Sequence, residues 1–150
     1  MSGPTGVDIF RVDTNPAKVG PLVNSTNVDD MPSLSPDNRW LAYTSDENGR
    51  SDRWQISSQG GGAPMWRRDG RELYFLTPQH RLMAVPVDPA GDVFHFGAPA
   101  PLFRADVAEW DTERVYAPFA DGKRFVIKVQ PRTDRTLLTI VTNWKPSSAR

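Results

Sequence analysis

The stretch APMWRRDGRELYFL, residues 63 to 76, places an Asp-Gly pair between two runs rich in aromatic and apolar side chains. Asp-Gly and Asp-Asn pairs favour the turns of β-hairpins, because Gly, Asn and Asp tolerate positive φ better than other residues do. Two further stretches share this pattern, MPSLSPDNRWLAYTS and VYAPFADGKRFVIKV. We therefore expect three hairpins with two-residue turns at Asp37-Asn38, Asp69-Gly70 and Asp121-Gly122.

The three copies also agree in the residues after each turn. A basic residue follows the turn in every copy, and the positions four and six after each Asp are apolar or aromatic. These positions hold Leu41 and Tyr43, Leu73 and Phe75, and Phe125 and Ile127. A spacing of two residues places each pair on one face of a strand. The aligned aspartates are 32 and then 52 residues apart, which brackets the period of about 40 to 50 residues that is typical of β-propeller blades.

The uneven spacing predicts units of different size. Between the second and third copies, the segments Arg81 to Asp88 and Asp92 to Phe103 supply two more strands, so this unit can form a four-stranded blade. Between the first and second copies we expect only a short strand at Trp54 to Ser57, so that blade is abbreviated. The fold class we expect is all-β, a partial propeller of about three antiparallel blades.

The chain divides into a short N-terminal part and the repeats. Residues 1–28 are expected to hold one strand, in the run VDIFRVD, followed by the loop TNPAKVG and a polar connector. Residues 29–150 hold the blade repeats, as a single domain or as a fragment of a larger propeller.

The composition excludes several classes of function. The chain has 150 residues with 18 basic and 18 acidic side chains, so its net charge gives no reason to expect a nucleic acid as partner. Because cysteine is absent, disulfides and thiolate metal sites are excluded. No stretch resembles a signal peptide or a membrane-spanning segment.

The segments SPDNRWLAYTSDENGR, GGGAPMWRRDGRELYFL and ADGKRFVIKV resemble the TolB-like, WD-type propeller repeats. Together with RLMAVPVD, GAPAPLF and IVTNW, their order is similar to the C-terminal end of the propeller sensor regions of some bacterial serine/threonine kinases. The resemblance covers residues 29–144. It implies four-stranded blades that serve as a scaffold for protein or ligand contacts, and it implies an extracytoplasmic or periplasmic location, although the sequence itself leaves the compartment open.

A stack of three blades cannot close a ring, so it leaves strand edges and an apolar blade face open. We therefore expect that the chain either associates with a copy of itself or forms part of a longer chain.

We predict no catalytic, cofactor or metal site. Each aligned Asp is explained by its turn, and Asp46, Asn48 and Asp52 do not follow the EF-hand pattern, so a polar loop is expected there. His80 is expected in a solvated turn and His95 in a packed strand. No Gly-x-Ser-x-Gly nucleophile elbow occurs.

The binding candidates are Trp66, Arg67, Arg68 and Trp110. Trp and Arg are enriched at the energetic centres of interfaces, although aromatic side chains between blades also pack as core. The function we expect is a non-enzymatic propeller scaffold or sensor module that binds a protein or small ligand. The alternative is the propeller portion of a larger enzyme, a receptor kinase or a propeller-gated peptidase, whose catalytic domain lies elsewhere.

Overall fold

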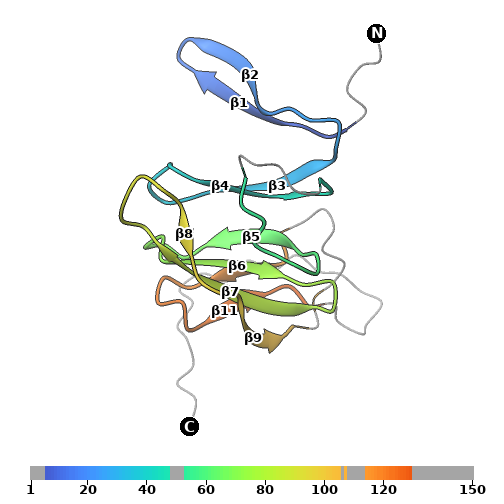
Figure 1. The fold of residues 1–150 in the computed structure, drawn as a ribbon, viewed down its shortest axis with the longest axis vertical. Helices are drawn as coiled ribbons and strands as arrows, with labels where there is room; N and C mark the ends of the chain where they lie inside the picture. Colours follow the sequence, from blue (N-terminus) through green and yellow to red (C-terminus); the bar gives the residue numbers. More distant parts are fainter. Residues whose placement is uncertain (1–5, 48–52, 106, 108–113, 130–150) are drawn as a thin grey trace, which may run out of the picture.

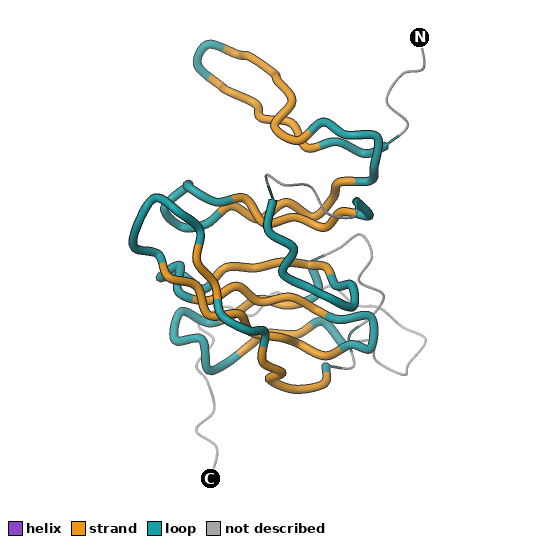
Figure 2. Tube along the Cα trace, in the orientation of Figure 1, coloured by secondary structure: helices purple, strands orange, loops and turns teal. Residues whose placement is uncertain are grey.

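The computed structural model describes residues 6–47, 53–105, 107 and 114–129 (Figure 1). This part of the chain contains only β-strands, turns and loops (Figure 2), which confirms the all-β class. None of its segments forms a helix that could cross a membrane. The strands are β1 (Ile9–Thr14), β2 (Ala17–Val23), β3 (Asp29–Leu34), β4 (Leu41–Ser45), β5 (Gly62–Trp66), β6 (Glu72–Leu76), β7 (Arg81–Asp88), β8 (His95–Phe96), β9 (Ala100–Arg104), β10 (Tyr116–Pro118) and β11 (Phe125–Ile127).

The strands form four antiparallel sheets. β1 pairs with β2, β3 with β4, and β10 with β11, while β5, β6 and β7 form a larger sheet in which both β8 and β9 pair with β7. Figure 1 shows the β1–β2 hairpin at one end, followed by the β3–β4 sheet and then by the larger sheet with β10–β11. The path β5-β6-β7-β9 agrees with the four strands expected for the unit that begins with the second copy of the repeat. A closed ring is not formed by the described residues.

The N-terminal prediction was wrong in one respect. The run predicted as the loop TNPAKVG contributes most of its residues to β2, which pairs with β1 from Thr14↔Ala17 to Ile9↔Val23. The hairpin loop consists of Asn15 and Pro16, joined by a cis peptide bond. The predicted loop holds Pro16 and Gly20, two residue types that favour turns. β2 itself contains Pro21, which an edge strand tolerates because an edge residue that faces away from the paired strand needs no N–H donor.

All three predicted turns form, but they are longer than two residues. In the second copy the Gly70 N–H donates a hydrogen bond to the Arg67 carbonyl, 2.9 Å away. The equivalent bonds are Asn38 to Ser35 and Gly122 to Phe119. Positive φ falls only on the last residue of each turn, with values of 61° at Asn38, 72° at Gly70 and 66° at Gly122.

The aligned aspartates close these turns with their side chains. Asp37 Oδ1 accepts the Arg39 N–H at 3.1 Å, Asp69 Oδ1 accepts the Arg71 N–H at 3.0 Å, and Asp121 Oδ1 accepts the Lys123 N–H at 3.0 Å. The hydrogen bond that the Ser35 hydroxyl donates to Asp37 at 2.6 Å, together with the bond from the Arg39 N–H, holds the pKa of Asp37 below its usual range. The bond from the Lys123 N–H is the main cause that lowers the pKa of Asp121. The prediction that the aspartates serve the turns is therefore confirmed.

A fourth turn shares the inner hydrogen bond and the positive φ of these turns, but its loop is shorter: the Thr77 N–H donates to the Arg81 carbonyl, four residues on, whereas the Arg67 N–H donates to the Glu72 carbonyl, five residues on. The His80 N–H donates to the Thr77 carbonyl at 2.9 Å, and His80 takes the positive φ of 59°. The expected turn at His80 is thus confirmed, with a histidine in the place that Asn38, Gly70 and Gly122 fill in the other turns.

The larger sheet is covered on both faces. Tyr74 and Leu76 of β6 pack in one cluster with Val115 and Tyr116, against which Phe125 of β11 also packs. Leu73 and Phe75 pack in the other cluster, together with Trp66, Val85 and Phe94, against which Trp40 and Ala42 pack. The predicted shared face of Leu73 and Phe75 is confirmed.

The short strand expected at Trp54 to Ser57 does not form. The Trp54 ring instead lies against the rings of Trp40 and Phe94, with centroid distances of 5.8 and 5.4 Å. Aromatic packing at this point replaces strand pairing.

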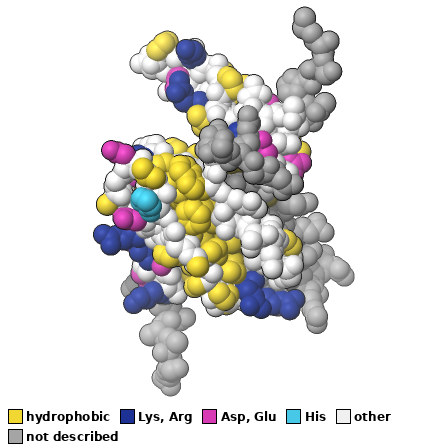
Figure 3. All heavy atoms as spheres, viewed as in Figure 1, with side chains coloured by type: hydrophobic (Ala, Val, Ile, Leu, Met, Phe, Trp, Pro, Cys, Tyr) yellow, Lys and Arg dark blue, Asp and Glu magenta, His cyan; other side chains and the backbone are white. Residues whose placement is uncertain are grey.

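An apolar band crosses the face that carries β8 and β9 (Figure 3). The large apolar side chains that are exposed on β8, on β9 and just before β8 are Val93, Phe96, Leu102 and Phe103. Contiguous exposed apolar surface commonly marks a site where another molecule binds.

Candidate ligand-binding cavity

The four predicted binding residues do not form one exposed patch. Trp66 is buried, and its indole N–H donates to the Ser33 carbonyl at 3.0 Å. Arg67 is largely covered, with 20 % of its side chain exposed, whereas Arg68 is exposed. Trp110 lies outside the described residues. The structure therefore leaves only Arg68 of the described candidates open to a partner.

The Arg67 guanidinium is occupied by acidic neighbours within the chain. Its Nε lies 2.7 Å from Asp69 Oδ1, and one of its terminal nitrogens lies 3.0 Å from Glu72 Oε2. The hydrogen bond from Arg67 lowers the pKa of Asp69 to about 2. The same hydrogen bond raises the pKa of Arg67 further above its already high value. This arrangement fixes the turn, and sequence reasoning could not distinguish it from an interface arginine.

Tyr74 extends this polar group into the core. Its hydroxyl donates to the Glu72 carboxylate, and burial together with this bond raises the pKa of Tyr74. Tyr116 on β10 is more deeply buried, and burial raises its pKa as well. Both phenols are therefore neutral hydrogen-bond donors at physiological pH.

A cavity of about 560 Å³ lies between β4, the segment 53–62 and the β5–β6 pair. Most of its apolar lining comes from aromatic residues, and Gly61 allows the chain to pass close to the sheet. The aromatic residues that line it are Trp40, Tyr43, Trp54, Trp66, Phe75 and Phe94. At Gly61 an added Cβ would lie 2.7 Å from a Phe75 ring carbon and 2.9 Å from the Leu76 carbonyl oxygen.

Phe94 lies at the centre of the aromatic group. Its ring centroid is 5.1 Å from that of Trp40, 5.4 Å from Trp54 and 6.3 Å from Trp66. Sequence reasoning missed Phe94 and expected its neighbour His95 to be packed. The structure buries Phe94, directly before β8, and exposes His95 within β8, so that prediction was wrong: the ring that packs against Trp40, Trp54 and Trp66 is the apolar Phe94.

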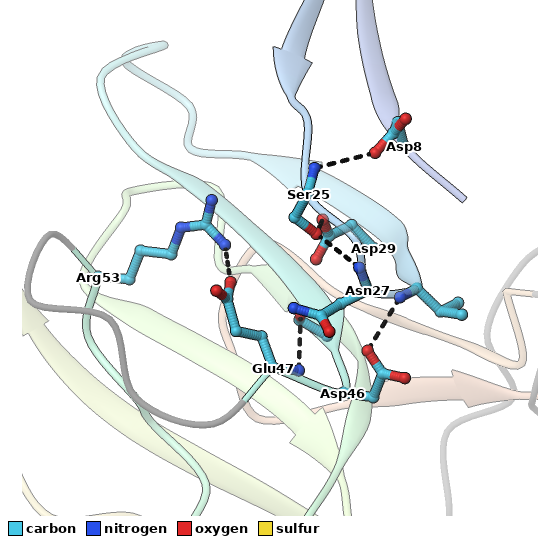
Figure 4. A network of polar contacts seen from close by, with 9 residues as sticks. Asp8, Ser25, Asn27, Asp29, Asp46, Glu47 and Arg53 are labelled. Atoms are coloured by element: carbon cyan, nitrogen blue, oxygen red, sulfur yellow. Dashed lines mark hydrogen bonds and ion pairs between the residues drawn. The ribbon is translucent and has the colours of Figure 1, made fainter. Parts of the chain in front are cut away.

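Three charged residues, Asp46, Glu47 and Arg53, also line the cavity, and their polar contacts are drawn in Figure 4. Arg53 forms an ion pair with Glu47, and its guanidinium carbon lies 5.6 Å from the centroid of the Tyr43 ring. Asp46, the described member of the candidate calcium loop, accepts the Val28 N–H at 2.9 Å, while Asn48 and Asp52 lie outside the described residues. In the described ranges no group of three or more acidic or histidine side chains is placed to hold a metal ion.

The composition of the cavity is that of a small-molecule site. Aromatic walls provide large contact areas with few rotatable bonds, and a few polar groups can orient a ligand. A cavity of this size lies within the range of about 300 to 1,000 Å³ for small-molecule sites.

Comparison of the chain with protein-family models, with curated proteins and with solved structures finds no match in any of the three. The cavity and the repeated turns therefore supply the basis for a functional proposal.

Proposed function

We propose that the chain is a portion of a TolB-like β-propeller of about three blades, one of them abbreviated, and that it acts as a non-enzymatic scaffold that binds a protein or ligand. The observation that carries this proposal is the common orientation of successive sheets. Leu73 and Phe75 of β6 belong to the apolar cluster against which Trp40 of the first copy packs. Phe125 of β11, which is equivalent to Leu73, packs against the cluster on the other face of the larger sheet. Each sheet thus turns the same face toward the one before it, as blades do.

Contacts between the first strands of the sheets support the same arrangement. The Ala63 N–H on β5 points to Met31 Sδ on β3 at 3.2 Å, and the Tyr116 hydroxyl on β10 donates to the Ala63 carbonyl at 2.7 Å. Met31 and Ala63 both have a φ of 52° and both precede a proline at a register shift. The first strands therefore lie next to one another, with the equivalent residues Met31 and Ala63 in contact between β3 and β5. This is the relation expected near a propeller axis.

The aromatic cavity is the binding site that we propose for this scaffold. It lies between the first and second repeat units, and its walls combine Trp40 and Tyr43 from one unit with Trp66 and Phe75 from the next. Pockets commonly form where two structural units meet.

A thermal-shift screen of the full chain against small ligands and short peptides tests the proposal. Compounds that bind in the cavity are expected to stabilise the wild-type chain and to lose this effect in Trp54→Ala. The matched control is Val126→Ala, which shortens an exposed apolar side chain on β11, away from the cavity lining. Compounds that stabilise Trp54→Ala as strongly as the wild type would show that the cavity is not the binding site.

A further inference from the structure

The β1–β2 hairpin stands apart from the remaining sheets in Figure 1. Four of its apolar side chains are more than half exposed: Phe10, Val12, Val19 and Leu22. Within the described residues β1 pairs with β2 alone, so its second edge faces no strand. An open strand edge presents unpaired N–H and C=O groups that can pair with another chain.

The two edges of this hairpin differ in how well they resist such pairing. β2 carries Lys18 and Pro21, and both residue types protect edges: proline removes a donor and lysine resists desolvation. Prolines also lie in other strands at sheet edges, at Pro32 in β3, Pro64 in β5, Pro101 in β9 and Pro118 in β10. β1, with the sequence IFRVDT, has neither proline nor lysine. It is a six-residue edge without these protective features.

We propose that β1 pairs with β1 of a second copy of this chain, antiparallel and centred on Val12. The result is a continuous sheet in the order β2-β1-β1-β2 across a two-fold axis. Such an isologous contact uses the same surface on both copies. The inference goes beyond the proposed function, because β1 does not line the aromatic cavity.

The charges on β1 select this register. In the register centred on Val12, Arg11 of each copy lies opposite Asp13 of the second copy, which gives two cross-strand pairs of opposite charge. Since the two residues opposite each other must point to the same face, the nearest alternative registers are centred on Arg11 or on Asp13, and they place Arg11 opposite Arg11 or Asp13 opposite Asp13. Like charges in these positions are destabilising. Larger shifts lose both pairs of opposite charge and leave fewer residues of the six-residue strand paired.

Both charged side chains are available for the new pairs. Within one copy Arg11 and Asp13 lie 3.2 Å apart, and their side chains are 65 % and 42 % exposed. An exposed ion pair of this kind contributes little to stability. Replacing it by an ion pair across the two-fold axis therefore costs the single copy little stability.

Cysteine cross-linking provides the first test, since the chain has no cysteine of its own. Opposite residues in antiparallel strands have Cα atoms about 4.5 to 5.5 Å apart, within reach of a disulfide. Under mild oxidation, full-length Val12→Cys is expected to form a covalent dimer. Val19→Cys is a matched control: Val19 is paired with Val12 on β2 and equally exposed, at 65 % against 64 %, but it lies away from the proposed axis. Equal cross-linking of both variants would overturn the proposal.

Charge reversal provides the second test, with light scattering after size-exclusion chromatography as the measurement. The wild-type chain is expected to dimerise, and Arg11→Asp or Asp13→Arg alone should weaken the dimer about tenfold or more, because two attractive pairs become repulsive. The double variant Arg11→Asp, Asp13→Arg should restore the dimer. A wild-type chain that stays monomeric at all concentrations, or single variants that dimerise as well as the wild type, would exclude this interface. Lys123→Glu, an exposed charge on another sheet, should leave the dimer unchanged.

Discussion

Gly70 and Gly122 occupy the same position in two copies of the turn but have different surroundings. Both have positive φ, which costs a residue with a side chain about 1 to 2 kcal/mol. An added Cβ at Gly70 would meet its nearest neighbour only at 3.9 Å. At Gly122 it would lie 2.7 Å from Arg67 Cδ and 2.8 Å from the Tyr74 hydroxyl. Gly122 thus allows the third turn to pack closely against the second unit.

We therefore expect Gly122→Ala to be the more destabilising of the two alanine variants. Gly70→Ala should lower the free energy of unfolding by about 1 kcal/mol, from backbone strain alone. Gly122→Ala should lower it by about 3 kcal/mol, because crowding of Arg67 and Tyr74 is added to the strain. Urea denaturation of both variants measures the difference. Equal losses would show that the third turn does not pack against Arg67.

Asp69 makes a predictable contribution to acid stability. Its pKa falls from 3.8 to about 2 in the folded chain because Arg67 binds the carboxylate. A depressed folded pKa stabilises the fold above the unfolded value, and this contribution is lost as the pH falls from about 4 to 2. Since 48 % of the Asp69 side chain is exposed, the gain is at most about 1 kcal/mol.

The corresponding variant is Asp69→Asn, with stability followed from pH 6 down to pH 2. Asparagine retains an oxygen that can accept the Arg71 N–H, so the turn itself should persist. We expect the variant to be less stable than the wild type at pH 6 and the two curves to converge near pH 2. A constant difference over the whole range would contradict a role for the carboxylate charge.

At the scale of the strands, sequence alone located the repeated hairpins well. The predicted strand Arg81 to Asp88 is β7 with identical bounds, because alternating apolar residues and flanking turn residues both mark it. The turn lengths were wrong because the same Asp-Gly pair also fits a longer loop in which only Gly takes positive φ. β2 was missed because proline and glycine argue against a strand unless the strand lies at an edge.

The candidate site was predicted less well than the strands. Trp66 and Arg67 have the residue types of an interface, yet both make contacts within the chain, because composition does not reveal which face of a strand a neighbouring sheet covers. Phe94 was missed for the same reason. Its role depends on Trp40 and Trp54, which are distant in sequence but adjacent in the fold.

Tyr116 connects strands of different repeat units, so a variant at this position tests whether the sheets are coupled. Its buried hydroxyl donates to the Ala63 carbonyl at 2.7 Å, so β10 is tied directly to β5. Tyr116→Phe keeps the ring but leaves that carbonyl without this donor, which should cost about 1 to 3 kcal/mol. Thermal unfolding followed by circular dichroism measures the loss. An unchanged midpoint would show that this bond does not couple the sheets.

At the scale of the whole molecule, stability is expected to be uneven. β6 and β7 contribute Tyr74, Leu76 and Val85, all without exposed surface, to clusters on both faces of one sheet. The β1–β2 hairpin has mostly exposed side chains. Segments with few buried apolar contacts open at lower free energy than the core does. The hairpin should therefore open without unfolding the larger sheet.

The junction between hairpin and core is polar, and Ser25 is its centre (Figure 4). The Ser25 hydroxyl donates to the buried Asp29 carboxylate at 2.7 Å and accepts the Asn27 N–H at 3.1 Å, while the Ser25 N–H donates to Asp8 at 3.1 Å. Ser25→Ala removes the hydroxyl contacts and leaves the backbone bond to Asp8.

Hydrogen exchange measured by mass spectrometry distinguishes a local effect of this variant from a global one. We expect Ser25→Ala to accelerate amide exchange in β2, whose side chains take little part in the core, while β6 and β7 keep their wild-type rates. The physical reason is that the hydroxyl fixes the connector to Asp29 but touches neither apolar cluster. Equal acceleration in β6 would mean that the β1–β2 hairpin and the larger sheet unfold in one cooperative step. The polar contacts of Ser25 would then couple the two regions instead of marking a boundary between regions of different stability.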